Sequence, residues 1–225
     1  MTTASTESWD HVPRNLRSIQ KAISAAAEGA GRDPESVRLV TVSKTFPLEA
    51  IQAALDAGQT LFGENRVQEA LPKIEKLTRS AASFHLIGHL QSNKARHAGA
   101  FGMVESVDSI KLAQAIDRRL DHPLPILLEV NVSGEVSKHG FTPDDLTGAY
   151  AEIGTLPNLD VRGLMTVAPL AADPEEVRPH FRHLRTLRDE LGLLELSMGM
   201  TNDFRVAIEE GATIVRIGRA IFGDR

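Results

Sequence analysis

The segment RLVTVSKTFPLEAIQAALDAGQTLFGEN, residues 38–65, contains the unit from which the rest of the fold can be inferred. Residues 38–43 are a largely apolar, β-branched run, which predicts a strand buried on both faces. Apolar residues at helical spacing follow over 47–57, and a second short apolar run occupies 60–64. A strand, a helix and a strand in this order predict two parallel strands joined by a crossover helix.

The same alternation continues to the end of the chain. It predicts eight strands: Arg38–Ser43, Thr60–Glu64, Phe84–Leu90, Met103–Val107, Ile126–Val132, Val161–Val167, Glu195–Met200 and Thr213–Ile217. The predicted helices are Pro47–Ala57, Val67–Thr78, Ser92–Ala98, Ser109–Leu120, Thr142–Thr155, Pro174–Leu191 and Asn202–Glu210. Eight such units favour an α/β fold of one domain over residues 1–225, closed into a (β/α)8 TIM barrel. An open doubly wound sheet is the competing arrangement.

The amino-terminal segment precedes this alternation. Apolar residues recur at helical spacing over 12–30, which predicts an extra helix that ends at Gly29 and Gly31. Residues 1–10 are mostly small and polar, and we expect them to be disordered.

The composition excludes several functional classes. The 225 residues contain no cysteine, so disulfides, thiolate metal sites and cysteine nucleophiles are absent. The net charge of −5 favours neither nucleic acid nor an anionic membrane as a partner. No signal peptide or membrane-spanning run is recognisable, which predicts a cytoplasmic protein.

Polar residues at the carboxyl ends of the predicted strands are the site candidates, because TIM barrels place their active residues there. Lys44 ends the first strand, where a partly desolvated amine can attack a carbonyl and form a Schiff base. The alternative is a lysine that only reaches out to water. Asn65 ends the second strand, and the alternative role for this residue is a helix N-cap.

Two turns near the end of the chain have the chemistry of a phosphate site. Ser197 and Thr201 offer hydroxyls, Gly199 permits close backbone approach, and a helix begins near Asn202. An ordinary capped helix start is the alternative.

The eighth strand supplies the second of these turns. Gly218 permits backbone amides to approach a ligand, and a short helix follows it. Arg216 interrupts an apolar strand and therefore must meet either an acidic side chain or a ligand.

Other polar residues give weaker indications. His85 and His89 could face the same side of the third strand as a metal pair, but no third ligand is evident, so satisfied or rim histidines are the favoured interpretation. Glu129 and Asn131 in the fifth strand point the same way, and one of them could pair with Arg216 or with a loop. The sequence shows no nucleophile elbow and no glycine-rich nucleotide fingerprint.

Together, an amine at a strand end and a phosphate site across the barrel suit a phosphorylated aldehyde, of which pyridoxal 5′-phosphate (PLP) is the common cellular example. Six blocks of the sequence then resemble the PLP homeostasis protein family over roughly residues 37–223. They are Val42–Thr45, Phe62–Glu69, His85–Lys94, Arg162–Met165, Leu196–Asp203 and Arg216–Gly223.

This resemblance implies a fold-type III PLP-binding barrel, like the N-terminal domain of alanine racemase. It implies that PLP, a form of vitamin B6, is bound covalently as a Schiff base on Lys44, with Asn65 near the ring and Arg216 facing the pyridine nitrogen. The residues implied to surround the phosphate are Ser197, Gly199, Thr201, Gly218 and Arg219.

The resemblance also bears on catalysis. An arginine at the ring nitrogen weakens the ring as an electron sink, and racemases of this type add a tyrosine from a second domain. The only tyrosine here is Tyr150, on a predicted helix. We therefore expect a non-catalytic PLP carrier in intracellular PLP homeostasis, monomeric, that delivers PLP to apo-enzymes. A small PLP-dependent amino-acid racemase and a Schiff-base aldolase are the alternatives.

Overall fold

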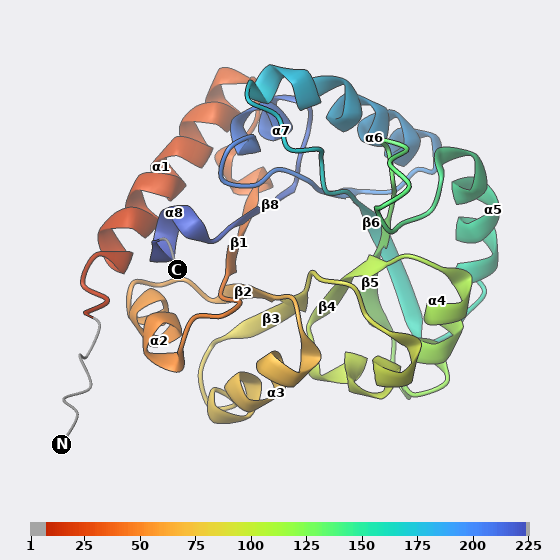
Figure 1. Cartoon of the computed structure of the whole chain (residues 1–225), viewed down its shortest axis with the longest axis horizontal. Helices are drawn as coiled ribbons and strands as arrows, with labels where there is room; N and C mark the ends of the chain where they lie inside the picture. Colours follow the sequence, from red (N-terminus) through yellow and green to blue (C-terminus); the bar gives the residue numbers. More distant parts are fainter. Residues whose placement is uncertain (1–7, 224–225) are drawn as a thin grey trace.

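The computed structural model describes residues 8–223, and its centre is a closed barrel of eight parallel strands (Figure 1). Each strand pairs with its neighbours in sequence, and β8 closes the barrel on β1. The strands are β1 Arg38–Val42, β2 Leu61–Glu64, β3 Ser83–Leu86, β4 Met103–Val107, β5 Leu124–Glu129, β6 Leu159–Met165, β7 Glu195–Ser197 and β8 Ile214–Ile217. The predicted TIM barrel is confirmed, and the open sheet is not.

Helices surround the barrel on the outside (Figure 1). The α-helices are α1 Val12–Gly29, α2 Leu48–Asp56, α3 Val67–Lys76, α4 Ile110–Asp117, α5 Pro143–Ile153, α6 Arg178–Glu190, α7 Phe204–Glu209 and α8 Arg219–Phe222. Three segments are 3-10 helices: η1 Pro34–Ser36, η2 Ser92–Ala100 and η3 Pro174–Val177.

Local sequence explains where several helices begin and which type they adopt. Ser109 and Thr142 cap α4 and α5, because each side-chain oxygen accepts a hydrogen bond from a backbone N–H in the first turn. The segment predicted as a helix over 92–98 is instead 3-10. Its buried residues, Ala95 and Ala98, are three positions apart, which matches three residues per turn.

The barrel interior has an apolar layer and, above it, a polar one. One compact apolar cluster joins five strands: Val40, Met103, Leu127, Met165 and Ile214. Side chains alternate along a strand, so residues two positions further on face the same way. Those positions include Glu105, Glu129 and Arg216, nearer the carboxyl ends of β4, β5 and β8. The strand pattern therefore places charged groups just below the barrel mouth.

Helix α1 covers the seam where β8 meets β1 and packs against α7 and α8 (Figure 1). Its contacts are specific, since Asn15 Nδ2 donates to the Ile221 carbonyl at 3.1 Å and His11 Nε2 lies 3.0 Å from the Phe222 carbonyl. The predicted extra amino-terminal helix is thus confirmed.

The expected disorder of residues 1–10 is only partly addressed, because residues 1–7 lie outside the described part of the chain. Residues 8–10 are not detached from the fold, contrary to that expectation. The Trp9 ring lies 6.0 Å from Phe46 in an edge-on arrangement, and this aromatic contact holds the segment against the barrel.

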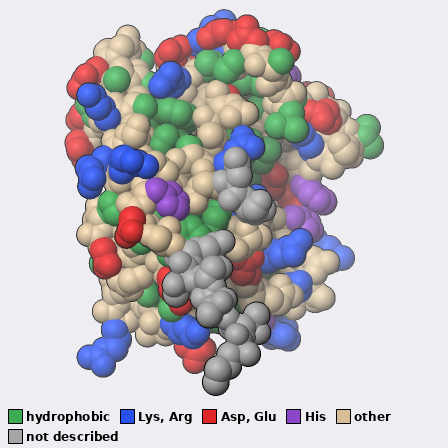
Figure 2. All heavy atoms as spheres, turned by 60° about the vertical axis from the view of Figure 1, so that its left-hand side comes forward, with side chains coloured by type: hydrophobic (Ala, Val, Ile, Leu, Met, Phe, Trp, Pro, Cys, Tyr) green, Lys and Arg blue, Asp and Glu red, His purple; other side chains and the backbone are tan. Residues whose placement is uncertain are grey.

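The surface gives no single-sign patch on the face shown in Figure 2, where acidic and basic side chains are interspersed. Within residues 8–223, no helix combines the length and the apolar character that crossing a membrane requires.

Candidate functional site

A cavity of about 930 Å³ opens at the carboxyl ends of the strands. The ends of β1, β2 and β8 and the loops after β6 and β7 form its walls. Six of the predicted site residues line it: Lys44, Asn65, Thr201, Arg216, Gly218 and Arg219. Parallel strands explain this convergence, because their carboxyl ends meet at one face of the barrel.

Lys44 is half-buried and lies two residues beyond the end of β1. The next residue, Thr45, has a φ of 66°, in the left-handed region that a β-branched residue rarely adopts. Such a conformation persists only where neighbouring groups hold it. Here the Thr45 N–H donates to Glu69 Oε1.

A buried charge network fixes the turn around Lys44. Lys73 Nζ, on α3, donates to the Ser43 carbonyl at 2.9 Å, to Glu64 Oε1 at 2.7 Å and to Glu69 Oε1 at 2.8 Å. Burial raises the pKa of the Glu64 carboxyl, although hydrogen bonds from Lys73 and Ser43 oppose the rise. The ammonium of Lys73 thus ties both flanks of Lys44 to the barrel.

The strand and helix pattern does not predict this network, although the sequence contains one signal for it. The buried residues of α3 are Val67, Ala70 and Lys73, so a lysine occupies the core-facing stripe of the helix. A lysine at such a position requires a buried partner, because burying an unpaired ammonium is costly.

Asn65 lines the cavity and does not cap a helix. The N-cap of α3 is Arg66, and no side-chain hydrogen bond caps it. A Cβ at Gly88 would lie 2.5 Å from the Asn65 carbonyl oxygen, so the loop after β3 packs directly against the Asn65 backbone. This contact fixes the end of β2 beside Lys44.

The turn after β7 lines the cavity from Met200 to Asp203, whereas Gly199, a predicted site residue, does not line it. Gly199 has a φ of 94°, and a Cβ there would lie 2.6 Å from the Ala207 Cβ, so the position accepts glycine alone. The Met200 N–H donates to Asp203 Oδ1 at 2.6 Å. Burial raises the pKa of the Asp203 carboxyl, against the opposing effects of that hydrogen bond and of Arg216. Helix α7 begins at Phe204, two residues later than predicted.

The turn after β8 lies beside it. A Cβ at Gly218 would lie 2.8 Å from the Val42 carbonyl oxygen, so only glycine allows this close approach of β8 to β1. Arg219 Nη2 donates to Asn202 Oδ1 at 3.4 Å, which links the two turns. Amides, a hydroxyl and a guanidinium therefore gather on one wall of the cavity.

Arg216 lies near an acidic side chain, which is one of the two partners expected from the sequence. It lines the cavity, yet its side chain is only 4% exposed. Its guanidinium donates to Ser197 Oγ and, at 2.8 Å, to the Thr166 carbonyl, and lies 3.9 Å from Glu105 Oε2.

Ser197 does not line the cavity. Its side chain is fully buried, and its hydroxyl donates to Glu105 Oε2 at 2.5 Å while accepting from Arg216. The structure thus directs this hydroxyl to the barrel interior, away from the predicted phosphate contact. The physical reason is strand alternation, because Ser197 is the last residue of β7 and faces Glu105 across the barrel.

His85 and His89 are not a metal pair, because β3 ends at Leu86 and His89 lies in the loop beyond it. His85 Nδ1 lies 2.6 Å from Glu105 Oε1 in the interior, as the satisfied-histidine interpretation expects. Burial raises the pKa of Glu105, but the hydrogen bond and charge of His85, with Arg216 and Ser197, outweigh burial and lower it.

Glu129 contributes to a smaller neighbouring pocket of about 190 Å³. Burial, with the charge of Asp108, raises the pKa of Glu129 to about 7, although Arg216 and His139 act in the opposite direction. Asn131 pairs with a loop, as one alternative foresaw, since its Nδ2 donates to the Glu135 carbonyl at 2.8 Å.

Comparison with known proteins gives consistent matches. The family described as alanine racemase, N-terminal domain, matches residues 12–225. A pyridoxal phosphate homeostasis protein of Aquifex aeolicus is 45% identical, covering 96% of this chain and 97% of the relative. The protein of the same description from Escherichia coli K12 is 39% identical, with coverages of 95% and 97%.

Solved structures of similar fold give the same family assignment. PipY of Synechococcus elongatus, determined with PLP bound, is 38% identical with a TM-score of 0.82, and the match covers 94% of this chain and all of PipY. Alanine racemase of Corynebacterium glutamicum has a TM-score of 0.69 at 17% identity, over 93% of this chain and 62% of the racemase, which shows a shared fold alone. The chain therefore belongs to the pyridoxal phosphate homeostasis proteins, a family built on the alanine racemase N-terminal barrel.

Proposed function

We propose that this protein binds PLP covalently through Lys44 and acts as a PLP carrier in PLP homeostasis. The observation that carries the proposal is the position of Lys44, whose side chain lines the same cavity as the turns after β7 and β8. A volume of about 930 Å³ lies within the roughly 300–1,000 Å³ typical of small-molecule sites. The relatives at 38–45% identity with PLP in their descriptions support the choice of cofactor.

The residues present fit the phosphate of PLP. Glycine is the only residue that the packing at 218 accepts, and it leaves the backbone amides of this turn accessible at the start of α8. Thr201 adds a hydroxyl and Arg219 a positive charge on the same wall. We propose that these groups hold the phosphate, together with backbone amides after Met200, whose own N–H already donates to Asp203.

The ring of PLP would lie between this wall and Lys44, near Asn65 and Arg216. PLP supplies an electrophilic carbonyl carbon and, in enzymes, an electron sink. Arg216 would face the ring nitrogen as a hydrogen-bond donor and so oppose its protonation, which weakens the sink.

The groups around the cavity favour a carrier over a racemase. Tyr150, the one tyrosine of the sequence, lies on α5 and packs against the hydrophobic core, away from the cavity-lining residues. Among the described residues that line the cavity there is also no histidine. The tyrosine that racemases of this type add therefore has no counterpart among these side chains, whose carboxyl group is that of Asp203. Delivery of PLP to apo-enzymes, a monomeric state and a cytoplasmic location stay predictions.

Borohydride reduction followed by mass mapping tests the covalent attachment. The reduced protein should carry one pyridoxyl phosphate group, on the peptide that contains Lys44. Lys44→Ala should lose this group, whereas Lys111→Ala, which changes an exposed lysine on α4, should keep it. Modification of another lysine in the unaltered protein would refute the assignment.

Incubation of the PLP-loaded protein with L-alanine and other L-amino acids tests the carrier role. Chiral chromatography should detect no D-enantiomer above the level formed by free PLP. Turnover that Lys44→Ala abolishes would establish a racemase instead.

A further inference from the structure

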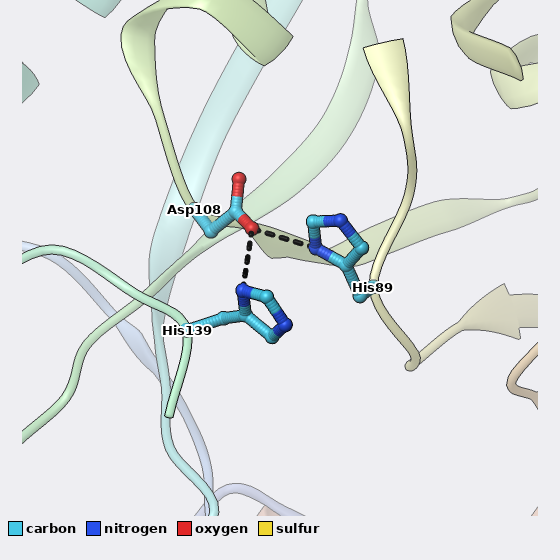
Figure 3. A group of neighbouring side chains, drawn as sticks. All are labelled: His89, Asp108 and His139. Atoms are coloured by element: carbon cyan, nitrogen blue, oxygen red, sulfur yellow. Dashed lines mark hydrogen bonds and ion pairs between the residues drawn. The ribbon is translucent and has the colours of Figure 1, made fainter. Parts of the chain in front are cut away.

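Two histidines and an aspartate meet at the barrel mouth on the side formed by β3, β4 and β5. His89 follows β3, Asp108 follows β4, and His139 lies in the loop after β5 (Figure 3). Their potential ligand atoms all lie within 4.8 Å of one another. None of the three lines the cavity that contains Lys44, so this cluster is separate from the proposed PLP site.

The spacing suits a small metal ion. Asp108 Oδ2 lies 2.8 Å from His89 Nδ1 and 3.8 Å from His139 Nδ1. Zinc bonds of about 2.0–2.2 Å in a tetrahedron place two ligand atoms about 3.3 Å apart. The two observed distances lie on either side of this value, so both nitrogens are near the separation that a shared ion requires.

The rings of His89 and His139 must turn before both can bind one ion, because a metal–Nδ1 bond lies in the plane of its imidazole. The imidazoles of His89 and His139 stack, with centroids 4.2 Å apart and planes at 13°. Both present Nδ1 toward the same carboxylate oxygen (Figure 3). His139 is the most exposed of the three, at 60% of its side chain, and can turn as an ion enters.

Surrounding contacts hold the carboxylate and the His139 backbone in place. Asp108 has only 10% of its side chain exposed, and its other oxygen, Oδ1, accepts a hydrogen bond from Ser109 Oγ at 3.2 Å. Such outer contacts orient metal ligands in proteins. Gly140 allows the loop to fold back, because a Cβ there would lie 2.8 Å from the Glu129 carbonyl oxygen.

The neighbouring charged groups are compatible with a cation. Glu129 lies in the same small pocket as His139, and the ammonium of Lys138, which also lines that pocket, pairs with Glu135 at 2.8 Å. Imidazole nitrogens and a carboxylate oxygen are ligands that Zn²⁺ and its neighbours in the transition series accept.

We propose that His89, Asp108 and His139 bind one divalent transition-metal ion of the zinc type, through two Nδ1 atoms and Oδ2. Three protein ligands leave a fourth position for water or another exchangeable ligand, as in open zinc sites. The competing interpretation is that His89 and Asp108 form only a hydrogen-bonded pair, on which the His139 ring stacks. That interpretation predicts no selective metal binding.

Calorimetric titration of tag-free, chelator-treated full-length protein with Zn²⁺ tests the proposal. One ion per chain should bind, and His139→Gln and Asp108→Asn should each weaken binding by at least about tenfold, the lower end of what even an outer contact costs. Titration with Co²⁺ should give the intense visible absorption of a tetrahedral site.

The chain contains a matched control. His122 Nδ1 lies 2.8 Å from Asp121 Oδ1, the same distance as in the His89–Asp108 pair, but both side chains are exposed and no third ligand joins them within the described residues. His122→Gln should leave Zn²⁺ binding unchanged. Equal loss in His122→Gln and His139→Gln, or no saturable binding in the unaltered protein, would overturn the proposal.

The Lys44→Ala variant separates this site from the PLP site. It should retain the Zn²⁺ stoichiometry and affinity of the unaltered protein, because Lys44 lies on the opposite wall of the barrel mouth. Loss of Zn²⁺ binding in Lys44→Ala would show that bound PLP, rather than the histidine cluster, supplies the ligands.

Discussion

The two halves of the barrel mouth have opposite chemical character. The half formed by β7, β8, β1 and β2 presents an amine, two guanidinium groups and backbone-rich turns. The half formed by β3, β4 and β5 presents carboxylates and imidazoles. One strand scaffold, with a shared apolar layer beneath, thus carries both proposed sites, one for PLP and one for a metal ion, because only the residues at the strand ends differ.

The two carboxylates of the polar layer show how this difference arises. Glu105 has hydrogen bonds from His85 and Ser197 and lies near Arg216, and its pKa is lowered. Glu129 is the last residue of the next strand, and its pKa rises to about 7. Burial acts on both, so the partners of each carboxylate, rather than its depth, decide its charge.

Arg216 links the two halves, so its removal should have the largest effect. Arg216→Leu removes the donor to Ser197 Oγ and the Thr166 carbonyl and leaves Glu105 with less compensation. We expect the PLP-free protein to lose about 3–5 kcal/mol of unfolding free energy, as when one partner of a buried pair is removed. Urea denaturation measures this loss.

The double variant Arg216→Leu with Glu105→Gln supplies the control. Neutralising the carboxylate should recover part of the lost stability, because the penalty arises from an uncompensated buried charge. Strict additivity of the two substitutions would show that Arg216 and Glu105 act independently. Arg216 would then not connect the two halves of the barrel mouth.

Glycine turns in the two halves should respond unequally to alanine. At Gly199 the positive φ and the 2.6 Å approach to Ala207 act together, so Gly199→Ala should cost about 2–4 kcal/mol and weaken PLP retention. Gly134, in the loop after β5, has a φ of 69° but no atom within 4 Å of an added Cβ. Gly134→Ala should therefore cost only about 1 kcal/mol. Similar unfolding midpoints for the two variants would contradict the tight packing of the turn after β7.

Glu129 should make stability depend on pH. Its native pKa of about 7 exceeds its ordinary value of 4.5, so the native state holds this proton more tightly than the unfolded chain does. The resulting stabilisation is complete below about pH 4.5 and is lost as the pH rises through 7. Glu129→Gln imitates the protonated form, so at pH 8 it should be more stable than the unaltered protein by about 1–3 kcal/mol.

Denaturation of chelator-treated protein at pH 4.5 and pH 8 measures this difference. The advantage of Glu129→Gln should vanish at the lower pH. Equal advantages at both values would mean that the glutamine improves packing and that the carboxyl is not the titrating group.

Most of the fold could be predicted because the β/α alternation is regular and the strands are apolar. In a parallel barrel, all strands end at the same face. The sequence therefore predicted that Lys44, Asn65 and Arg216, each at or near a strand end, would line one cavity. The phosphate contact predicted for the Ser197 hydroxyl depends on local geometry that the sequence pattern does not give. Ser197 is still inside β7, where side-chain alternation directs its hydroxyl into the barrel.

The histidine cluster could not be predicted, because it depends on the path of a loop. Phe141 donates its N–H to the Glu129 carbonyl at 2.8 Å and accepts from the Asn131 N–H at 2.9 Å. These bonds fold the segment back and deliver His139 to Asp108. Periodicity describes strands and helices, whereas such a loop closure follows from tertiary contacts that no spacing rule encodes.

The smallest effect should come from His89→Ala in the absence of metal. The His89–Asp108 contact of 2.8 Å is partly exposed, with 41% of the histidine side chain accessible, and pairs of this kind contribute below about 1 kcal/mol. The metal-free variant should therefore unfold almost at the urea concentration of the unaltered protein. Addition of Zn²⁺ should then raise the midpoint of the unaltered protein alone, because a ligand that binds only the native state stabilises it by an amount that grows with the logarithm of ligand concentration over Kd. A large loss of stability in metal-free His89→Ala would instead assign the cluster a structural role, and equal Zn²⁺ stabilisation of both proteins would place the ion elsewhere.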